Sequence, residues 1–197
     1  MYCIDLNINL PIFNTTLNPV EFLKSRPAWA NNINTNKTLA KHFKLDYETE
    51  VSQEVKDFFD RHNFYIEVIE VFYLFPNDVM SIHTDRAVPG DFSKVNWIYG
   101  GKDSVMKWYK VINGSGSGAP LYKTPINSPS LQYTAAEVEL VNTQAVGHPS
   151  LVQVGCPHNV VNGPEERFCV SLVFKHKLTR TRVTMSEAED TFKEYIK

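Results

Sequence analysis

Between residues 65 and 175 the chain carries one strand-like segment after another, with no helical pattern between them. The segments are short, rich in β-branched and aromatic residues, and separated by Gly, Pro and Asn. A succession of strands without intervening helices is typical of an antiparallel sandwich or barrel. The predicted strands are residues 65–75, 94–99, 105–112, 137–146, 150–154, 158–161 and 167–175.

Helical signals flank this β-rich region. Residues 51–59 place four apolar side chains on one stripe of a helix, and this stripe must cover another element. Asn18, followed by a proline, resembles a helix start. Ser186 and Glu189 have the spacing of a capping box, which predicts a C-terminal helix to about Ile196.

These elements predict a single domain over the 197 residues, a length sufficient for a substantial core. We expect a helical buttress at residues 1–63, packed on the outside of the major sheet. A β core follows at residues 64–176, and a helical extension at residues 177–197. Residues 113–135 have a run of Gly and Ser directly after Asn113 and contain three prolines, which is typical of a lid or binding loop.

Charge and cysteine content narrow the class of protein. The formal net charge is −2 and both signs are mixed along the chain, so we expect no nucleic-acid partner and no membrane patch. Cys3, Cys156 and Cys169 are too widely spaced for a disulfide framework or a zinc cluster. The first ten residues lack the basic region of a signal peptide. We therefore expect a soluble cytoplasmic protein, in the host cytoplasm if the source is viral.

A histidine and a carboxylate stand two residues apart at the end of a strand-like run. His83 and Asp85 would project from the same face of an extended strand and could reach one point in space. One interpretation is a metal site, although an HxD triplet also arises often by chance. The alternative is a histidine at a strand end, followed by an aspartate that caps the next turn.

His158 would supply a third ligand. Pro157 removes a ladder donor, so the strand is predicted to begin at His158. If this strand end converges with that of His83 and Asp85, two nitrogens and one oxygen form a facial triad of the kind that binds Fe(II). His148 is the main alternative to His158 as the third ligand.

Arg167 begins the last predicted strand. By alternation it shares one face with Cys169 and Ser171, while Phe168 and its apolar neighbours take the other face. An arginine among small residues needs a partner, and its planar fork suits a carboxylate. That carboxylate belongs either to a ligand or to the protein itself, as an internal salt bridge.

In order, His83-x-Asp85, His158 and Arg167 on short strands resemble the 2-oxoglutarate- and Fe(II)-dependent dioxygenase superfamily. The resemblance covers about residues 65–175. The segment from His83 to Trp97 is also similar to small phage and bacterial hydroxylases of the prolyl or aspartyl/asparaginyl type.

This resemblance implies a mostly β fold, a double-stranded β-helix of the jelly-roll or cupin-like kind. It implies that His83, Asp85 and His158 bind Fe(II) and that Arg167 pairs with the distal carboxylate of 2-oxoglutarate. The implied reaction uses O₂ to hydroxylate a C–H bond and releases succinate and CO₂. The substrate would be an amino acid, a peptide or protein side chain, or a small metabolite.

Two further polar residues are candidates for contacts with 2-oxoglutarate. Asn96 is a polar residue inside a predicted strand, although it could also face solvent on an edge. Many members of the superfamily carry Ser or Thr two residues after the arginine. This chain has Cys169 there, so Ser171 is the candidate substitute. Tyr73 and Trp97 are either pocket walls or core residues.

Two other functions would use a similar β fold. A cupin-like metal-binding or ligand-binding protein or isomerase usually has more histidines and a glutamate in its first ligand cluster, and the sequence around His83 lacks them. A non-enzymatic β-sandwich would bind no metal and would give Arg167 no reason to point inward.

Overall fold

The structure is a computed structural model. It describes residues 1–31, 41–85, 89–112, 121–123, 129–147 and 149–197. Within these residues the strands form two six-stranded antiparallel sheets. The first sheet has the order β1 (Cys3–Asp5), β10 (Ser150–Gln153), β5 (Ser93–Gly100), β12 (Arg167–His176), β3 (Phe64–Leu74) and β2 (Lys41–Leu45). The second has the order β7 (Leu121–Lys123), β8 (Pro129–Tyr133), β4 (Ile82–Thr84), β11 (His158–Val161), β6 (Val105–Val111) and β9 (Val138–Ala145).

The path of the chain through the two sheets is that of a jelly roll. Strands β3, β5, β10 and β12 lie in the first sheet, and β4, β6, β9 and β11 lie in the second. The chain alternates between the sheets as far as β6, pairs β6 with β9 within the second sheet, and alternates again to β12. This is the double-stranded β-helix arrangement of cupins. The predicted fold class is therefore confirmed by the strand order.

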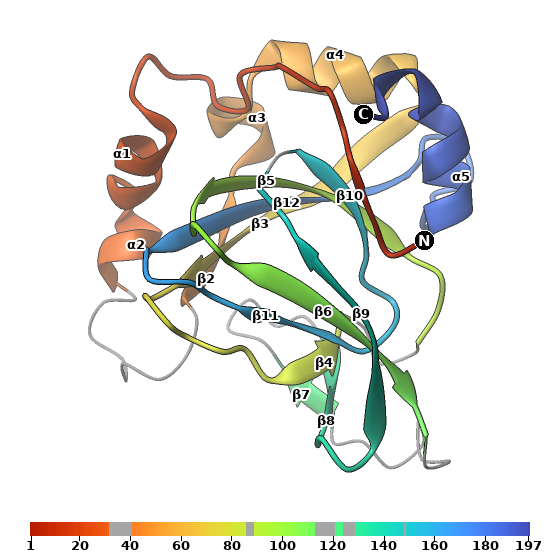
Figure 1. Ribbon diagram of the computed structural model, residues 1–197. Helices are drawn as coiled ribbons and strands as arrows, with labels where there is room; N and C mark the ends of the chain where they lie inside the picture. The colour runs from red at the N-terminus through yellow and green to blue at the C-terminus, as the bar shows by residue number, and fades with distance from the viewer. Residues whose placement is uncertain (32–40, 86–88, 113–120, 124–128, 148) are drawn as a thin grey trace.

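Helices cover the outer face of the first sheet, as Figure 1 shows. Alternation along β12 turns Phe168, Val170 and Leu172 outward, into one apolar cluster with Val55 and Phe59 of the longest N-terminal helix. The helices are α1 (Pro19–Lys24), α2 (Pro27–Asn31), α3 (Tyr47–Glu50), α4 (Gln53–Arg61), α5 (Met185–Thr191) and the 3₁₀ turn η1 (Lys193–Tyr195). The predicted packing of N-terminal helices on the major sheet is thus confirmed.

Two expectations about strands need correction. Residues 1–63 are not only helical, because β1 and β2 occupy the two edges of the first sheet. Edge strands of three and five residues are too short to show a pattern of their own. Residues 113–135 are not wholly irregular, because β7 and β8 extend the second sheet beside β4. The rest of that predicted lid, residues 113–120 and 124–128, lies outside the described residues.

The predicted helix boundaries shift by a few residues. Helix α4 begins at Gln53, because the hydroxyl of Ser52 accepts a hydrogen bond from the backbone N–H of Val55. Helix α5 begins before Ser186, because Thr184 and Glu187 form the capping box. The sequence contains two overlapping pairs with this spacing, and the earlier pair caps the helix.

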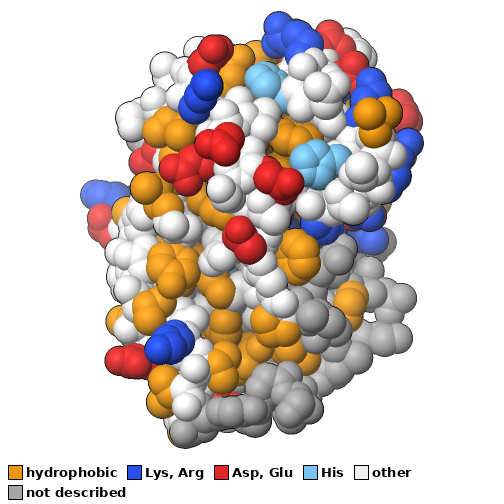
Figure 2. Space-filling model, turned by 90° about the vertical axis from the view of Figure 1, so that its right-hand side faces the viewer, with side chains coloured by type: hydrophobic (Ala, Val, Ile, Leu, Met, Phe, Trp, Pro, Cys, Tyr) orange, Lys and Arg blue, Asp and Glu red, His pale blue; other side chains and the backbone are white. Residues whose placement is uncertain are grey.

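The two sheets differ in how much of their outer surface is covered. Figure 2 shows side chains of both charges gathered on the upper part of one face of the molecule and hydrophobic side chains over its lower part. Strand β9 of the second sheet contributes the exposed residues Leu140 and Val141.

Among the described residues, no helix has the length and apolar character needed to span a membrane.

Candidate metal centre

Three of the predicted ligands meet at one end of the second sheet. His83 lies in β4, Asp85 follows the end of that strand, and His158 is the first residue of β11. Strands β4 and β11 are antiparallel neighbours, and His158 lies directly opposite His83 in their register. Their ring centroids are 4.6 Å apart. The strand pairing therefore joins residues that are 75 positions apart in the sequence (158 − 83).

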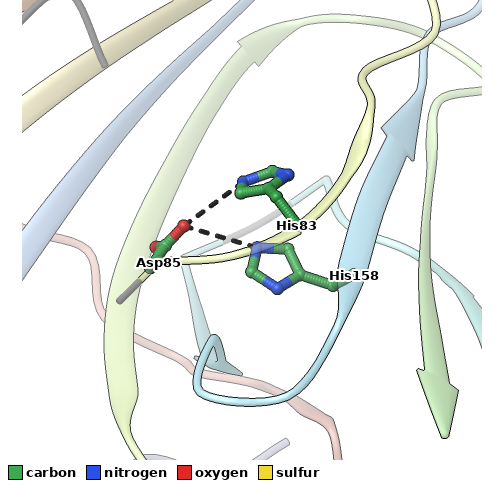
Figure 3. Close-up of side chains that lie close together, drawn as sticks. All are labelled: His83, Asp85 and His158. Atoms are coloured by element: carbon green, nitrogen blue, oxygen red, sulfur yellow. Dashed lines mark ion pairs between the residues drawn. The ribbon is translucent and has the colours of Figure 1, made fainter. Parts of the chain in front are cut away.

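The three side chains converge on one point, as Figure 3 shows. Asp85 Oδ1 lies 3.3 Å from His83 Nε2 and 3.7 Å from His158 Nε2. One ligand atom from each residue lies within 4.8 Å of the others. Neighbouring ligands about 2.1 Å from a common ion in octahedral geometry are about 3 Å apart, close to the separations at Asp85. This group could therefore hold a metal ion.

Backbone carbonyls fix the orientation of both imidazole rings. The Nδ1 of His83 lies 2.8 Å from the carbonyl oxygen of Ser81, and the Nδ1 of His158 lies 2.9 Å from that of Cys156. A carbonyl oxygen only accepts hydrogen bonds, so each Nδ1 carries the proton. In the neutral rings, each Nε2 then directs a lone pair towards Asp85, as metal-ligating histidines do.

The electrostatics of the group suit metal binding. Burial alone would raise the carboxyl pKa of Asp85, but the charge of Lys94 and a hydrogen bond from His83 hold it well below its ordinary value. Burial and the charge of His83 lower the pKa of His158 to about 4. Asp85 is thus ionised and His158 neutral at pH 7, the forms that bind metals.

The pKa of His83 is shifted in the opposite direction from that of His158. Burial would lower its pKa, but the hydrogen bond and the charge of Asp85 outweigh burial and raise the pKa above its ordinary value. When His83 is protonated, the proton on its Nε2 faces Asp85 Oδ1. A metal ion takes the place of that proton, since metals and protons compete for the same lone pair.

An inner cavity connects the three ligands to Arg167. Its lining includes His83, Asp85, His158 and Arg167. Arg167 is only 2 % exposed, and its Nε has no hydrogen-bond partner. Among the described residues no carboxylate forms an ion pair with it, and burial lowers the pKa of its guanidinium. The internal salt bridge, which was the alternative to a ligand carboxylate as the partner of Arg167, is therefore absent from the described part of the chain.

Asn96 and Ser171 line the same cavity. They are direct neighbours in the register of β5 and β12, and both are buried. The Oδ1 of Asn96 has no hydrogen-bond partner, so a second unsatisfied polar atom belongs to a residue of this cavity. Cys169 also lines it and forms a hydrogen bond with Arg167. The residues predicted to bind the metal and 2-oxoglutarate thus line one cavity.

Other candidates lie elsewhere. Tyr73 and Trp97 are core residues in the apolar cluster beneath the helices, so their interpretation as pocket walls is wrong. Tyr73 directly follows Phe72, and Trp97 directly follows Asn96. Phe72 and Asn96 both line the cavity, so alternation along each strand turns Tyr73 and Trp97 to the opposite, outer face. His148, the alternative third ligand, lies outside the described residues.

Two residues of the site were not predicted from the sequence. Lys94, in β5, places its Nζ 2.6 Å from Asp85 Oδ2 and 2.5 Å from Glu70 Oε2. Both Lys94 and Glu70 are buried. A signal was present, since Lys94 stands two residues before Asn96 and alternation places both on one face. Glu70 is likewise a charged residue in an otherwise mostly apolar strand, and unlike Glu67 of the same strand it is buried.

A larger cleft of about 570 Å³ meets the site from another side. Asp85 lines both this outer cleft and the inner cavity, whereas Lys94 and Glu70 line the outer cleft. Charged residues of both signs, including Lys44 and Arg182, make up much of the rest of its lining. The outer cleft therefore meets the site at Asp85, whereas His83 and His158 are not among its described lining residues.

Comparison with known proteins finds only distant structural similarity for this chain. No protein-family model matches the sequence, and no curated protein matches it. One similar solved structure is an oxidoreductase of the 2OG-Fe(II) oxygenase family from Burkholderia pseudomallei, with a TM-score of 0.38 and 14 % identity over 66 % of this chain. The chain covers 55 % of that protein's length.

Two further structures have comparable scores. Peruvianin-I, a cysteine peptidase from Thevetia peruviana latex, has a TM-score of 0.37 and 12 % identity over 89 % of this chain and 94 % of its own. Oxalate oxidase has a TM-score of 0.36 and 10 % identity over 98 % of this chain and 88 % of its own. Structural similarity at this level supports no conclusion about function. The assignment of the jelly-roll fold rests on the strand order.

Proposed function

We propose that the protein is a non-haem Fe(II)- and 2-oxoglutarate-dependent oxygenase. In this proposal His83, Asp85 and His158 hold the iron, and Arg167 binds the distal carboxylate of 2-oxoglutarate. With O₂, iron and 2-oxoglutarate would supply hydroxylation of a C–H bond, with succinate and CO₂ as products. The chain's own residues bind and orient the reactants and exclude water.

The observation that carries the proposal is the buried guanidinium of Arg167 in the cavity of the three ligands. A buried charge without a counter-charge is unfavourable, and a carboxylate from a bound molecule would relieve it. 2-Oxoglutarate has a keto-acid end that suits a metal and a second carboxylate that suits a guanidinium. The residues present therefore fit both groups.

Asn96 and Ser171 would hydrogen-bond the co-substrate between these two ends. The amide of Asn96 can present either its oxygen or its nitrogen to the cavity after rotation of its side chain. Ser171 offers a hydroxyl that both donates and accepts. Cys169 would act indirectly, because its hydrogen bond is to Arg167 rather than to the co-substrate.

The outer cleft is the proposed site of the substrate that is hydroxylated. It reaches Asp85 from a side that Arg167, Asn96 and Ser171 do not line. The co-substrate and the substrate would then approach the iron from different directions. The charged lining suits a polar substrate, such as an amino acid, a polar side chain of a peptide or protein, or a small polar metabolite.

An anaerobic titration tests the proposal. Adding 2-oxoglutarate to the Fe(II)-loaded protein should produce a weak visible charge-transfer band. His83→Ala should abolish the band through loss of iron. Arg167→Met should retain iron and require far more 2-oxoglutarate to reach the same band. If iron binds and 2-oxoglutarate causes no spectral change, the cupin-like metal-binding alternative replaces the oxygenase.

A further inference from the structure

The candidate metal ligand Asp85 belongs to a row of three charged side chains, Asp85, Lys94 and Glu70. Lys94 lies between Asp85 and Glu70, at 2.6 Å from one carboxylate and 2.5 Å from the other. The side chains of Lys94 and Glu70 are 5 % and 6 % exposed. Burial would lower the pKa of Lys94, but the two carboxylates raise it, so the ammonium keeps its charge.

The two oxygens of Asp85 face different partners. Oδ1 faces the Nε2 atoms of His83 and His158, whereas Oδ2 faces Lys94. A carboxylate can bind a metal ion through one oxygen or through both. While Oδ2 accepts the hydrogen bond from Lys94, only Oδ1 is available to an ion.

We propose that Lys94 is a positioning residue that keeps Asp85 a one-oxygen ligand and so leaves the remaining coordination positions open to other molecules. This inference rests on the metal site of the proposed function. The co-substrate and O₂ together need open positions on the metal, and a second oxygen from Asp85 would occupy one of them. Lys94 therefore governs how many positions remain.

The placement of Lys94 in the fold suits this role. All three candidate ligands belong to the second sheet or follow one of its strands, whereas Lys94 and Glu70 belong to neighbouring parts of the first sheet. Strands β3 and β5, which carry them, both pair with β12. Glu70 thus anchors Lys94 on a rigid sheet, and the ammonium holds the ligand across the interior of the barrel.

Lys94 also lies outside the inner cavity, where the co-substrate is proposed to bind. It does not line the inner cavity, which Arg167 lines, and it contacts one oxygen each of Asp85 and Glu70. A structural role alone, as a link between the sheets, would affect stability without altering metal coordination. The test must therefore read out the metal directly.

The test compares Co(II) binding to the double variant Lys94→Met/Glu70→Gln with binding to Glu70→Gln alone. The double variant removes the lysine without leaving Glu70 as a buried unpaired charge. In Glu70→Gln, Lys94 still donates to Oδ2, so the visible Co(II) spectrum should match that of the wild-type protein. In the double variant Oδ2 becomes free. We expect a changed spectrum with lower absorption intensity and an affinity about tenfold weaker, the low end of effects seen when residues behind a ligand are removed.

Lys175→Met is the matched control. It removes the lysine of a different ion pair within the first sheet, that of Lys175 in β12 with Glu67 in β3, which contacts none of the ligands. Its Co(II) spectrum and affinity should equal those of the wild-type protein. An unchanged spectrum and affinity in Lys94→Met/Glu70→Gln would overturn the role of Lys94 while leaving the metal site intact. Failure of the wild-type protein itself to bind Co(II) would instead remove the site and the proposed function together.

A crystal structure of the wild-type protein with Mn(II) decides the same question if the double variant does not fold. We expect the ion to contact Asp85 Oδ1 alone, with Lys94 still hydrogen-bonded to Oδ2. Contact of both carboxylate oxygens with the ion, and displacement of Lys94, would contradict the inference.

Discussion

Replacing Arg167 with methionine should stabilise the ligand-free protein, even though it removes a fully buried side chain. Arg167 is 2 % exposed, its Nε lacks a hydrogen-bond partner, and no described carboxylate pairs with it. Methionine has a similar length and carries no charge. Replacing buried ionic groups with apolar ones of similar size often stabilises proteins by about 1–4 kcal/mol. We expect a gain of about 2 kcal/mol, which corresponds to a rise in Tm of about 4–8 °C for a chain of this length.

The same substitution should have the opposite effect on the protein with its co-substrate. Loss of one partner of a buried charge pair weakens binding by about 2–5 kcal/mol. A loss of about 3 kcal/mol raises the Kd for 2-oxoglutarate more than a hundredfold. Addition of 2-oxoglutarate to the metal-loaded wild-type protein should therefore raise its Tm, and the same addition should leave the Tm of Arg167→Met unchanged.

Thermal and urea denaturation, with and without 2-oxoglutarate, measure both effects. Arg26→Met is the control, because Arg26 donates a 2.8 Å hydrogen bond to Glu50 in a partly exposed ion pair. Its loss should lower stability by no more than about 1 kcal/mol and leave 2-oxoglutarate binding intact. The reasoning is refuted if Arg167→Met destabilises the ligand-free protein by about 3–5 kcal/mol, as removal of one partner of an internal salt bridge does.

Three further outcomes follow from the structure. Burial lowers the pKa of His42 to about 4, so its proton binds more readily in the unfolded state, and stability should fall by up to about 3 kcal/mol as the pH drops from 6.5 to 4. Urea unfolding measured across this pH range should show a smaller loss of stability in His42→Gln than in the wild-type protein. Equal losses in the two proteins would show that His42 is not the cause. Cys169→Ser should tighten 2-oxoglutarate binding severalfold in the Fe(II) titration, because a hydroxyl orients Arg167 more strongly than a thiol does; weaker binding would count against that role. Phe59→Ala, in the fully buried layer between α4 and the first sheet, should lower the free energy of unfolding by about 3–5 kcal/mol, and a loss below about 1 kcal/mol would contradict the packing.

Features that depend on the two-residue period of a strand could be predicted from the sequence. Alternation alone assigned Arg167 and Ser171 to one face of β12 and Phe168 to the other, and the structure confirms both assignments. The same rule placed His83 and Asp85 on one side of the chain. A residue's face depends only on its neighbours in the same strand, so no knowledge of the fold was needed.

Features that depend on strand pairing could not be derived in this way. His158 lies beside His83 because β11 pairs with β4, and no local pattern specifies which strands become neighbours. The convergence of the three ligands was therefore a hypothesis until the strand order was known. The domain organisation into buttress, core and extension remains a prediction.

Lys94 was missed for a different physical reason. A lysine inside a strand usually faces solvent, since burial of its charge is unfavourable. Here two carboxylates from other elements offset that penalty, and both come close only in the folded chain. The buried charge is thus evident only when Glu70, Lys94 and Asp85 are considered together.

The binding stoichiometry of Co(II) tests the central claim, that three residues distant in the sequence hold one metal ion. Isothermal titration of the metal-free protein should give one ion per chain, and the same titration of His158→Ala should show that this site is lost or greatly weakened. Binding of one ion with equal affinity to both proteins would show that the metal lies elsewhere, and the account of the site would then be wrong.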